Sequence, residues 1–295
     1  MDIRILKYFI AVAQEESITK AAEALHTSQP NLSRQLNDLE KEVGRTLLER
    51  GSRKISLTEE GMFLLKRAKE IVELLERTEA DLDLFDENAS GDVHIGAAET
   101  HAMRLIAHAI QSLQESYPQI LFHIFSGSTI EVKEQLDKGL LDFAILVDLV
   151  DPQKYGHIRL PVNDTWGVLM RRDSPLAKLD CIRPEDIRDK PLLCSRQMLD
   201  ANDISEWIGE DFKNLNVVTT FNLITTPAMM VEEGVGYTFT FDKLVNTTGD
   251  CNLCFRPLEP KFETGLYLVW KKYEIFTKAS KVFLEEVQRG FVRSH

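Results

Sequence analysis

The 295-residue chain is predicted to fold as an α/β multidomain protein: an N-terminal winged helix-turn-helix, a long linker helix and a C-terminal α/β domain of two subdomains. Three observations predict this fold class. Residues 17–57 contain two short helical patterns separated by a tight turn and followed by a basic hairpin pattern. Residues 59–87 repeat apolar side chains at helical spacing. From residue 92 onward, apolar strand patterns alternate with amphipathic helix patterns.

The first sixteen residues are predicted to form a folded helix. One apolar face is made by Ile3, Leu6, Phe9, Ile10 and Ala13, which recur at helical spacing. Charged residues interrupt the stretch, so it lacks the continuous apolar run of a secretory signal peptide. No segment of the sequence is apolar for long enough to span a membrane. These features predict a cytoplasmic protein that has no membrane partner.

A helix-turn-helix is predicted next, with a short helix over residues 20–25, a turn at 26–27 and a second helix that opens at Ser28. Ser28 is a good N-cap because its hydroxyl can accept a hydrogen bond from an otherwise unpaired backbone N–H. Pro30 fits the first helical turn, where no N–H is needed. The second helix is expected to end at Gly44 and to bury a stripe of Leu32, Leu36, Leu39 and Val43.

The polar residues of this second helix are left to face outward: Gln29, Asn31, Ser33, Arg34 and Gln35. Gln and Asn can pair with adenine, and Arg can pair with guanine or a phosphate. Two short strands around residues 51–52 then predict a wing, because apolar and polar residues alternate there. The wing would place basic side chains beside phosphates or a minor groove. Its alternative interpretation is a solvated basic hairpin on any small domain.

The helix and wing together give ten candidate DNA-contacting residues: Ser28, Gln29, Pro30, Asn31, Ser33, Arg34, Gln35, Arg50, Arg53 and Lys54. The formal net charge of −12 excludes a generally basic nucleic-acid binder. Residues 1–60 contain nine of the 35 basic and ten of the 47 acidic side chains. The rest of the chain contains 26 basic and 37 acidic side chains, so the negative charge lies mainly after residue 60. DNA affinity would therefore depend on a local patch and on the pairing of two or more copies.

Residues 59–87 are predicted to continue as one helix, roughly 43 Å long at 1.5 Å per residue. Its apolar seam is made by Phe63, Leu64, Ala68, Ile71, Val72, Leu75, Thr78, Glu79, Leu82 and Phe85. A helix with such a stripe needs a partner, which can be its own domain or another helix. Residues 88–91 follow as a hinge.

The remainder is predicted to be a parallel sheet covered by helices on both faces. The expected strands are 92–99, 120–125, 143–147, 191–195, 217–222 and 234–239, and the expected helices are 103–117, 130–138, 226–233 and one within 272–295. A strand at 162–171 leaves the first subdomain and a strand at 265–271 returns to it. The predicted division is 1–58 for the winged helix-turn-helix, 59–90 for the linker, 91–162 with 266–295 for one subdomain, and 163–265 for the other.

Several residues of the first sixty match a known family pattern: Phe9, Val12, Ser17, Ala21, Ala22, Leu25, Ser28, Gln29, Pro30, Leu32, Ser33, Leu39, Glu40, Gly44, Leu47, Arg50, Leu57, Thr58 and Gly61. The segment resembles the N-terminal domain of LysR-type transcriptional regulators. Leu48 departs from the pattern, which usually has Phe there, but the exchange is apolar. The layout after residue 90 resembles the effector-binding domain of the same family, which is built like a type II periplasmic binding protein.

The resemblance implies a sequence-specific DNA-binding transcriptional regulator whose activity a small molecule modulates. It implies that linker helices pair to form a homodimer or homotetramer on double-stranded DNA with an inverted-repeat operator, and that RNA polymerase is a partner. It implies a small-molecule co-inducer bound between the two subdomains, and no other cofactor or metal is expected. The sequence does not identify the effector, the operator or the sign of regulation.

Ligands of such open sheets bind beyond the carboxyl ends of the strands. Carried over by position, the resemblance gives nine candidate effector-binding residues: Thr100, His101, Ser126, Ser128, Thr129, Ser195, Arg196, Asn222 and Thr225, with Glu99, Gln197 and Thr226 beside them. Hydroxyls and helix N-termini suit a small carboxylate or phosphate, and Arg196 could pair with it. Glu99 and His101 could instead accommodate a cationic or polar ligand. Thr225 and Thr226 can equally be simple helix caps.

The four cysteines are Cys181, Cys194, Cys251 and Cys254, of which the last two form a C-x-x-C. A zinc site usually needs a second pair or two histidines, and neither is near in sequence. Packing is therefore favoured over redox or metal sensing. A solute-binding module remains as an alternative function, since the C-terminal portion alone would fit one. An enzyme is not expected, because the sequence has no nucleophile elbow, no H-E-x-x-H and no Gly-rich phosphate loop.

Overall fold

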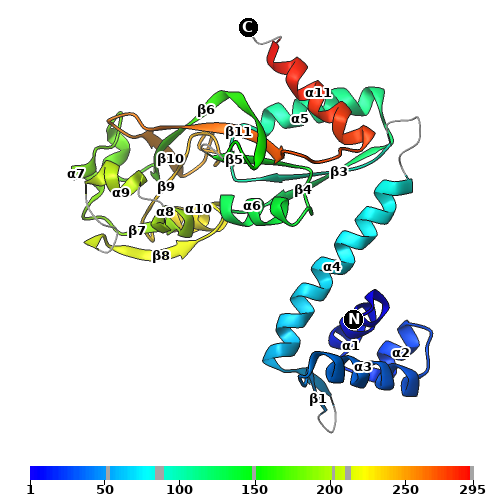
Figure 1. The fold of residues 1–295 in the computed structure, drawn as a ribbon. Coiled ribbons are helices and arrows are strands. Elements are labelled where there is room, and N and C mark those ends of the chain that lie inside the picture. Colours follow the sequence, from blue (N-terminus) through cyan, green and yellow to red (C-terminus); the bar gives the residue numbers. More distant parts are fainter. Residues whose placement is uncertain (51–53, 84–89, 148–150, 201–202, 210–213, 293–295) are drawn as a thin grey trace. The chain divides into compact units, whose positions relative to one another are not determined.

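The computed structural model describes residues 1–50, 54–83, 90–147, 151–200, 203–209 and 214–292, and the chain divides into two compact units (Figure 1). The first unit is Met1–Asp83 and the second is Leu84–His295. Each unit has its own hydrophobic core. The predicted residues Arg53 and Phe85, and residues 88–89 of the predicted hinge, lie outside the described residues. Within the described ranges, no helix is both long and apolar enough to cross a membrane.

The first unit contains the predicted helix-turn-helix and wing. Its elements are α1 (Ile3–Glu15), α2 (Ile18–Ala24), α3 (Gln29–Val43), β1 (Leu48–Arg50), β2 (Ile55–Leu57) and α4 (Glu59–Asp83). Helix α2 begins at residue 18 instead of 20, because the Ser17 hydroxyl accepts a hydrogen bond from the Lys20 N–H and caps it there. Strands β1 and β2 pair antiparallel, which confirms the wing.

Two local predictions for α3 are wrong. The sequence places Val43 in the buried stripe, but it is 37% exposed at the last turn, while Leu32, Leu36 and Leu39 are buried. Ser28 occupies the N-cap position with extended backbone angles, but its hydroxyl makes no capping hydrogen bond. Pro30 lies in the first turn, as predicted, and Gly44 ends the helix in the left-handed conformation. The Ser28 side chain is exposed and remains available to a ligand.

The residues between α3 and α4 are fixed by backbone contacts that the sequence did not reveal. Glu40 Oε1 accepts hydrogen bonds from the backbone N–H groups of Leu47 (2.7 Å) and Leu48 (3.1 Å). Thr58 donates from its hydroxyl to the Thr46 carbonyl (2.8 Å) and accepts from the Gly61 N–H (2.9 Å). These contacts fix the wing against α3 and cap the start of α4.

Only part of the apolar surface of helix α4 packs against the core of its own unit. Ala68 is buried, and Leu64 and Leu65 pack against the core of the first unit. Lys7 of α1 also donates to Glu76 of α4 (2.7 Å). Other apolar side chains of α4 are exposed in the single chain: Met62, Phe63, Ile71, Leu74 and Leu82. Packing onto its own domain therefore covers Leu64 and Ala68 of the predicted seam and leaves Phe63, Ile71 and Leu82 exposed.

The second unit is built on a mixed sheet that has nine strands in the described residues, in the order β4-β3-β5-β11-β6-β9-β7-β8, with β10 paired to β6. Its first part contains β3 (Gly91–Ala97), α5 (Met103–Ser116), β4 (Ile120–Ser126), α6 (Thr129–Asp137), β5 (Phe143–Val147) and α11 (Lys278–Val292). Strands β4, β3 and β5 are parallel. Helices α5 and α11 cover one face and α6 covers the other (Figure 1), as predicted.

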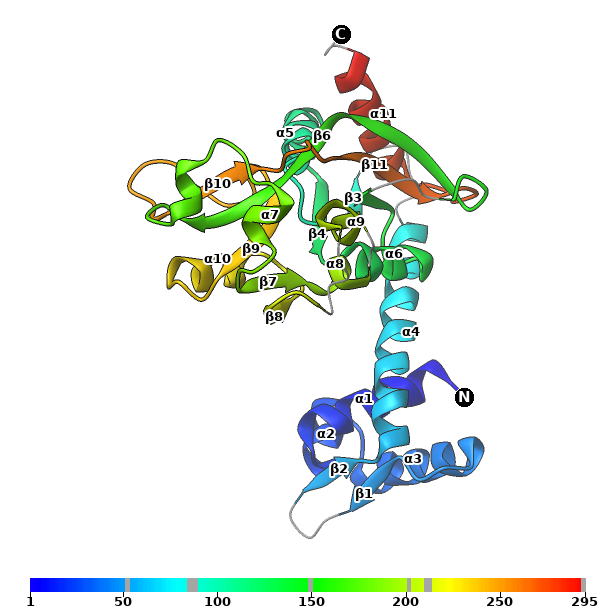
Figure 2. The same ribbon diagram turned by 90° about the vertical axis from the view of Figure 1, so that its left-hand side faces the viewer.

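The second part contains a short 3₁₀ helix η1 (Pro175–Lys178), α7 (Pro184–Ile187), β7 (Leu192–Ser195), α8 (Arg196–Asp200), α9 (Asp203–Ile208), β8 (Val217–Phe221), α10 (Thr225–Glu232), β9 (Tyr237–Phe241) and β10 (Leu253–Pro257). Two strands cross between the parts: β6 (Tyr155–Arg171) and β11 (Glu263–Lys271), which Figure 2 shows side by side. Strand β6 begins seven residues before the predicted start, because Tyr155–Arg159 already pair with β11. Both crossovers run antiparallel to their partners, so the sheet is not purely parallel as predicted.

Candidate functional site

The outer face of α3 carries the predicted recognition residues. Ser28, Gln29, Pro30 and Arg34 are exposed, whereas Asn31, Ser33 and Gln35 are half-buried. The exposed residues lie at the start of the helix and on the side away from Leu32 and Leu36. This arrangement leaves donors and acceptors on a rigid helix surface, where an incoming groove could meet them.

Asn31 links the turn to the arginine of this face. Its Nδ2 donates to the Thr27 hydroxyl (3.1 Å), and its Oδ1 accepts from Arg34 Nη2 (3.4 Å). The turn, the amide and the guanidinium therefore form a short chain of hydrogen bonds along the helix surface. Such a chain restricts the rotamers of Arg34 before any ligand is bound.

The structure describes only part of the predicted basic wing. The backbone of Arg50 lies in β1 opposite Ile55, but its side chain and all of Arg53 fall outside the described residues. Lys54 is exposed and forms an ion pair with Glu16. That pair is solvent-exposed on both sides, so it holds the lysine weakly and leaves it free to exchange partners.

A cavity of about 130 Å³ lies between the two subdomains of the second unit. Glu99, Ser128, Thr129 and Val147 line it from the first subdomain. The second subdomain contributes Ser195, Gln197, Met198, Ile204, Phe221, Asn222, Ile224, Phe239, Thr240, Phe241 and Leu244. Because the wall comes from both sides, movement of one subdomain against the other would change the volume of the cavity.

Two pairs of residues join the subdomains at this cavity. The Thr129 N–H donates to Gln197 Oε1 (3.0 Å), and Gln197 Nε2 donates to the Thr129 hydroxyl (3.0 Å). On the other side, the Ile224 N–H donates to Glu99 Oε2 (2.6 Å). Each contact joins one subdomain to the other, so the two together form an inter-subdomain latch.

The predicted effector residues divide into three groups. Ser128, Thr129, Ser195 and Asn222 line the cavity. Arg196 and Thr225 line a wider outer groove of about 710 Å³ that also includes Ser128, Asn222 and Thr226. Thr100, His101 and Ser126 line neither of these two spaces. The described geometry therefore brings the hydroxyl residues together and places Arg196 at the outer groove.

Thr100 supports a loop instead of facing the cavity. It is buried, and its hydroxyl accepts from the Ala102 N–H (3.0 Å). The Thr100 side chain and the His101 backbone also bond to Asp164 on β6. Asp164 is 4% exposed, and its Oδ2 has no hydrogen-bond partner among the described residues. Burial raises the pKa of Asp164, although the bonds from Thr100 and the charge of His101 act in the opposite direction.

Several cavity residues were missed by the sequence analysis because they come from the crossover strands. Trp166 of β6 and Thr264 of β11 line the cavity, and Trp166 Nε1 donates to the Thr264 hydroxyl (2.8 Å). The Trp166 ring packs against Phe241 with a centroid separation of 4.3 Å. The signal that could have identified them is the position of a Trp on the strand predicted to connect the subdomains.

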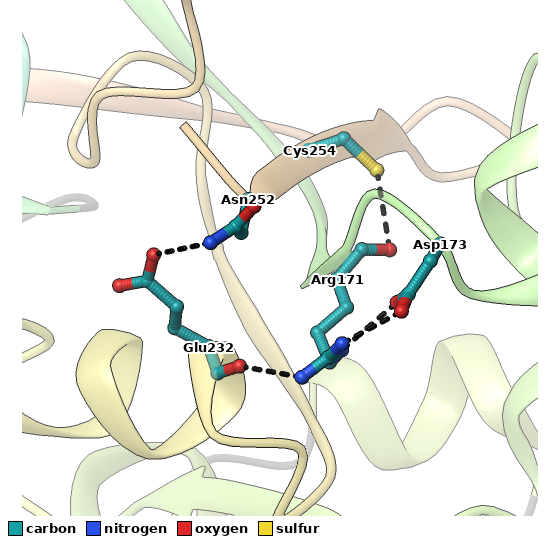
Figure 3. A network of polar contacts seen from close by, with 5 residues as sticks. All are labelled: Arg171, Asp173, Glu232, Asn252 and Cys254. Atoms are coloured by element: carbon teal, nitrogen blue, oxygen red, sulfur yellow. Dashed lines mark hydrogen bonds and ion pairs between the residues drawn. The ribbon is translucent and has the colours of Figure 1, made fainter. Parts of the chain in front are cut away.

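Cys194, Cys251 and Cys254 are engaged in packing and backbone contacts. Cys254 Sγ contacts the Arg171 carbonyl (3.9 Å), and Arg171 is held by Asp173 and by the Glu232 carbonyl (Figure 3). Cys251 Sγ contacts the Asn246 carbonyl (3.1 Å). Burial raises the pKa of the Cys194 thiol to about 12 and also raises that of Cys254. Raised pKa values make thiolates scarce at neutral pH, and thiolates are the reactive form.

One further cluster was not predicted. Asp92 and His94 of β3 and His123 of β4 bring ligand-type atoms within 4.8 Å of one another. The two imidazole rings stack with a centroid separation of 4.5 Å, and His123 Nε2 lies 3.4 Å from Asp92 Oδ2. A contact between His123 and Asp92 beside a ring stack on a partly exposed sheet face accounts for this geometry, since parallel planes do not direct two imidazole nitrogens at one ion.

Comparison with known proteins gives two family matches. Residues 3–62 match the model of the bacterial regulatory helix-turn-helix protein, lysR family, and residues 86–292 match the LysR substrate binding domain. The chain is 33% identical over 221 residues to the HTH-type transcriptional regulator BsdA of Bacillus subtilis, covering 74% of each chain. It is 33% identical over 194 residues to the DNA-binding transcriptional dual regulator OxyR of Escherichia coli, covering 65% of this chain.

The chain spans about 63% of the length of that OxyR relative. Among solved structures, full-length CbnR in complex with its target DNA aligns with a TM-score of 0.74 at 21% identity, covering 98% of this chain and 100% of that one. This likeness concerns the fold. With both domain models matched in the same order along the sequence, the chain belongs to the LysR family of bacterial helix-turn-helix regulators.

Proposed function

We propose that the protein is a sequence-specific DNA-binding transcriptional regulator that acts in the cytoplasm and responds to a small molecule bound between its two α/β subdomains. The observation that carries the DNA-binding part is the outer face of α3, where Gln29 and Arg34 are exposed and Arg34 is oriented by Asn31. The solved complex of full-length CbnR with its target DNA supports this part. Each α3 would enter a major groove, and two copies would read an inverted repeat.

The proposed division of labour follows the predicted boundaries. Residues 1–58 bind DNA, 59–90 link and pair two chains, and 91–162 with 266–295 form one effector subdomain opposite 163–265. Support for the pairing is the exposed apolar surface of α4, and further association of effector domains would give a homotetramer. Double-stranded DNA and RNA polymerase are the proposed macromolecular partners, and a small co-inducer is the proposed ligand.

The latch suggests how the ligand would act. Gln197 is bonded to Thr129, and Glu99 is bonded to Ile224, so two residue pairs join the subdomains across the cavity. A molecule that enters the cavity can shift the equilibrium between subdomain arrangements only by binding one arrangement more tightly than the other. A change in the angle between subdomains would then alter the spacing of paired DNA-binding units, and through it DNA bending and polymerase contact.

The test is footprinting of the purified full-length protein on sheared host DNA at several salt concentrations. We expect a few sites that contain an inverted repeat. Arg34→Ala should weaken binding to these sites by about 1–3 kcal/mol, or roughly 5- to 150-fold. Lys41→Ala is the matched control, because Lys41 is an exposed cation near the other end of α3. Binding that is weak, erased by salt and independent of sequence, or equal affinity of Arg34→Ala and the native protein, would contradict the proposal.

A further inference from the structure

We infer that the ligand of the inter-subdomain cavity is a small organic cation, a protonated amine on a short apolar body, with the Glu99 carboxylate as its counter-ion and the Trp166 and Phe241 rings beside it. This inference rests on the proposed effector role of the cavity and names the chemical class of its ligand. It differs from the expectation of a carboxylate or phosphate ligand paired with Arg196.

The charge of the cavity is the first argument. Among the described residues that line it, Glu99 is the only one that is ionisable. No lysine, arginine or histidine is part of this described wall, so an anionic ligand would meet a like charge without compensation. Arg196 lines the outer groove instead. An anion moved from water to this wall would lose hydration and gain repulsion.

The groups that could bind an anion are the second argument, because the protein already uses them. The Ser128 N–H donates to Glu131 Oε2 (2.7 Å), so a carboxylate of the chain itself caps the start of α6. The next N–H, of Thr129, donates to Gln197. At the start of α10, the Ile224 N–H donates to Glu99. These helix starts are therefore already occupied by acceptors of the protein.

The state of Glu99 is the third argument. The hydrogen bond from Ile224 reaches Oε2 and fixes the carboxylate at the cavity wall. Burial raises the pKa of Glu99, since no cation compensates the loss of water, and the Ile224 bond offsets this only in part. A bound ammonium would supply the missing charge, and the hydroxyls of Thr240 and Thr264, which also line the cavity, can accept hydrogen bonds from its N–H groups.

The shape and aromatic content of the cavity complete the argument. Trp166 and Phe241 lie in contact on one wall, and Phe221 and Phe239 add further rings. Aromatic faces attract cations and also pack against an apolar body. The volume of about 130 Å³ is close to the roughly 150 Å³ of an engineered cavity that holds benzene. The cavity therefore suits a molecule of about that size.

The experiment uses full-length protein and three probes of one shape and different charge: benzylamine, benzyl alcohol and benzoate. Cyclohexylamine and isobutylamine extend the amine set to other bodies. Titration calorimetry at neutral pH should give the tightest binding for an amine. Glu99→Gln keeps an acceptor for the Ile224 N–H and removes the charge, so it should weaken amine binding by about 10- to 100-fold. It should leave the affinity for benzyl alcohol within about twofold of the native value.

Glu131→Gln is the matched control. It removes the same charge from the neighbouring groove, and glutamine can also serve in a capping box, so amine binding should be unchanged. Thermal unfolding of each variant establishes that it is folded. Tightest binding of benzoate, with loss in Arg196→Gln, would overturn the inference in favour of an anion in the outer groove. Equal binding of the three matched probes, or binding of none of the amines, would overturn it as well.

A second measurement distinguishes failure of the proposed function from failure of the proposed ligand class. Operator affinity is measured in the same samples with and without the tightest amine. If an amine binds through Glu99 and operator affinity does not change, the ligand class stands and the regulatory role of the cavity fails. If operator binding is sequence-specific but amines do not bind, the regulator stands and the ligand class fails.

Discussion

At the residue scale, Glu40 shows how one side chain joins the recognition helix to the wing. Its Oε1 accepts both the Leu47 and the Leu48 N–H groups, and both leucines are buried. Glu40→Ala would leave two backbone donors without their acceptor, and we expect it to destabilise the first unit by about 2–3 kcal/mol. Chemical denaturation followed by circular dichroism measures this loss. Glu42→Ala, at an exposed position of the same helix, should cost less than about 1 kcal/mol; equal losses would refute the role of Glu40.

Asp164 gives a residue-scale prediction about pH. Burial raises its pKa in the folded protein, so between the ordinary value of 3.8 and that raised value the folded state holds more protons than the unfolded state. Stability therefore falls as pH rises through the raised pKa. Asp164→Asn keeps an acceptor for Thr100 without the charge. It should melt a few degrees higher than the native protein at neutral pH, and the difference should shrink as pH falls toward about 4.

The control for Asp164 is a carboxylate with the opposite shift. The hydrogen bond from Arg171 lowers the pKa of Asp173, so Asp173→Asn should be neutral or slightly destabilising at neutral pH. Melting curves of both variants over the same pH range give the comparison. A difference between Asp164→Asn and the native protein that is the same at every pH would show that charge is not its cause.

At the element scale, the start of α4 depends on a close approach of two backbones. A Cβ on Gly61 would lie 2.1 Å from the Leu47 carbonyl oxygen, although Gly61 has an ordinary helical conformation. Gly61→Ala should therefore cost about 1–3 kcal/mol through forced displacement of the helix from the wing. A Cβ added to Gly290 in α11 would meet no atom within 4 Å, so Gly290→Ala should be neutral or stabilising by up to about 1 kcal/mol. Thermal unfolding of the two variants measures these changes in stability. A Gly61→Ala variant as stable as the native protein would exclude the steric explanation.

The elements also show which features the sequence could predict. Strand β5 and helices α5 and α6 were predicted to within one residue at each end, because their periodicity and their breakers are local. The early start of β6 was missed, since its pairing with β11 joins residues as far apart in the sequence as Tyr155 and Lys271, a separation of 116 positions. The part of the cavity wall made by Trp166 and Thr264 was missed for the same reason. These two residues become neighbours only when the crossover strands β6 and β11 pair. Ser128 and Thr129 were found because they follow a strand directly.

At the scale of the whole molecule, the acidic net charge and the small recognition surface imply that the proposed tight DNA binding would need two or more paired chains. The latch also belongs to this scale, since Gln197 and Glu99 bond to residues of the other subdomain that lie 68 and 125 positions away in the sequence. Neither feature can be read from one element. Both require that a change in one place alters the geometry of an assembly.

Pairing through α4 is the prediction that belongs to this scale. Ile71 and Leu74 are 42% and 40% exposed in the single chain and lie on one side of the helix. Two such helices packed together would bury these side chains, so a charge placed there would have to be buried without a partner. Ile71→Glu should therefore convert a dimer into a monomer, or a tetramer into a smaller assembly held by its effector domains, as measured by light scattering. Lys69→Glu adds the same side chain to the polar side of α4 and should leave the assembly intact.

Loss of the dimer should also lower operator affinity by about 100-fold or more, because the second half-site would no longer be bound in the same complex. A native protein that is monomeric at micromolar concentration, or an Ile71→Glu variant that keeps the native assembly, would exclude α4 as the pairing surface.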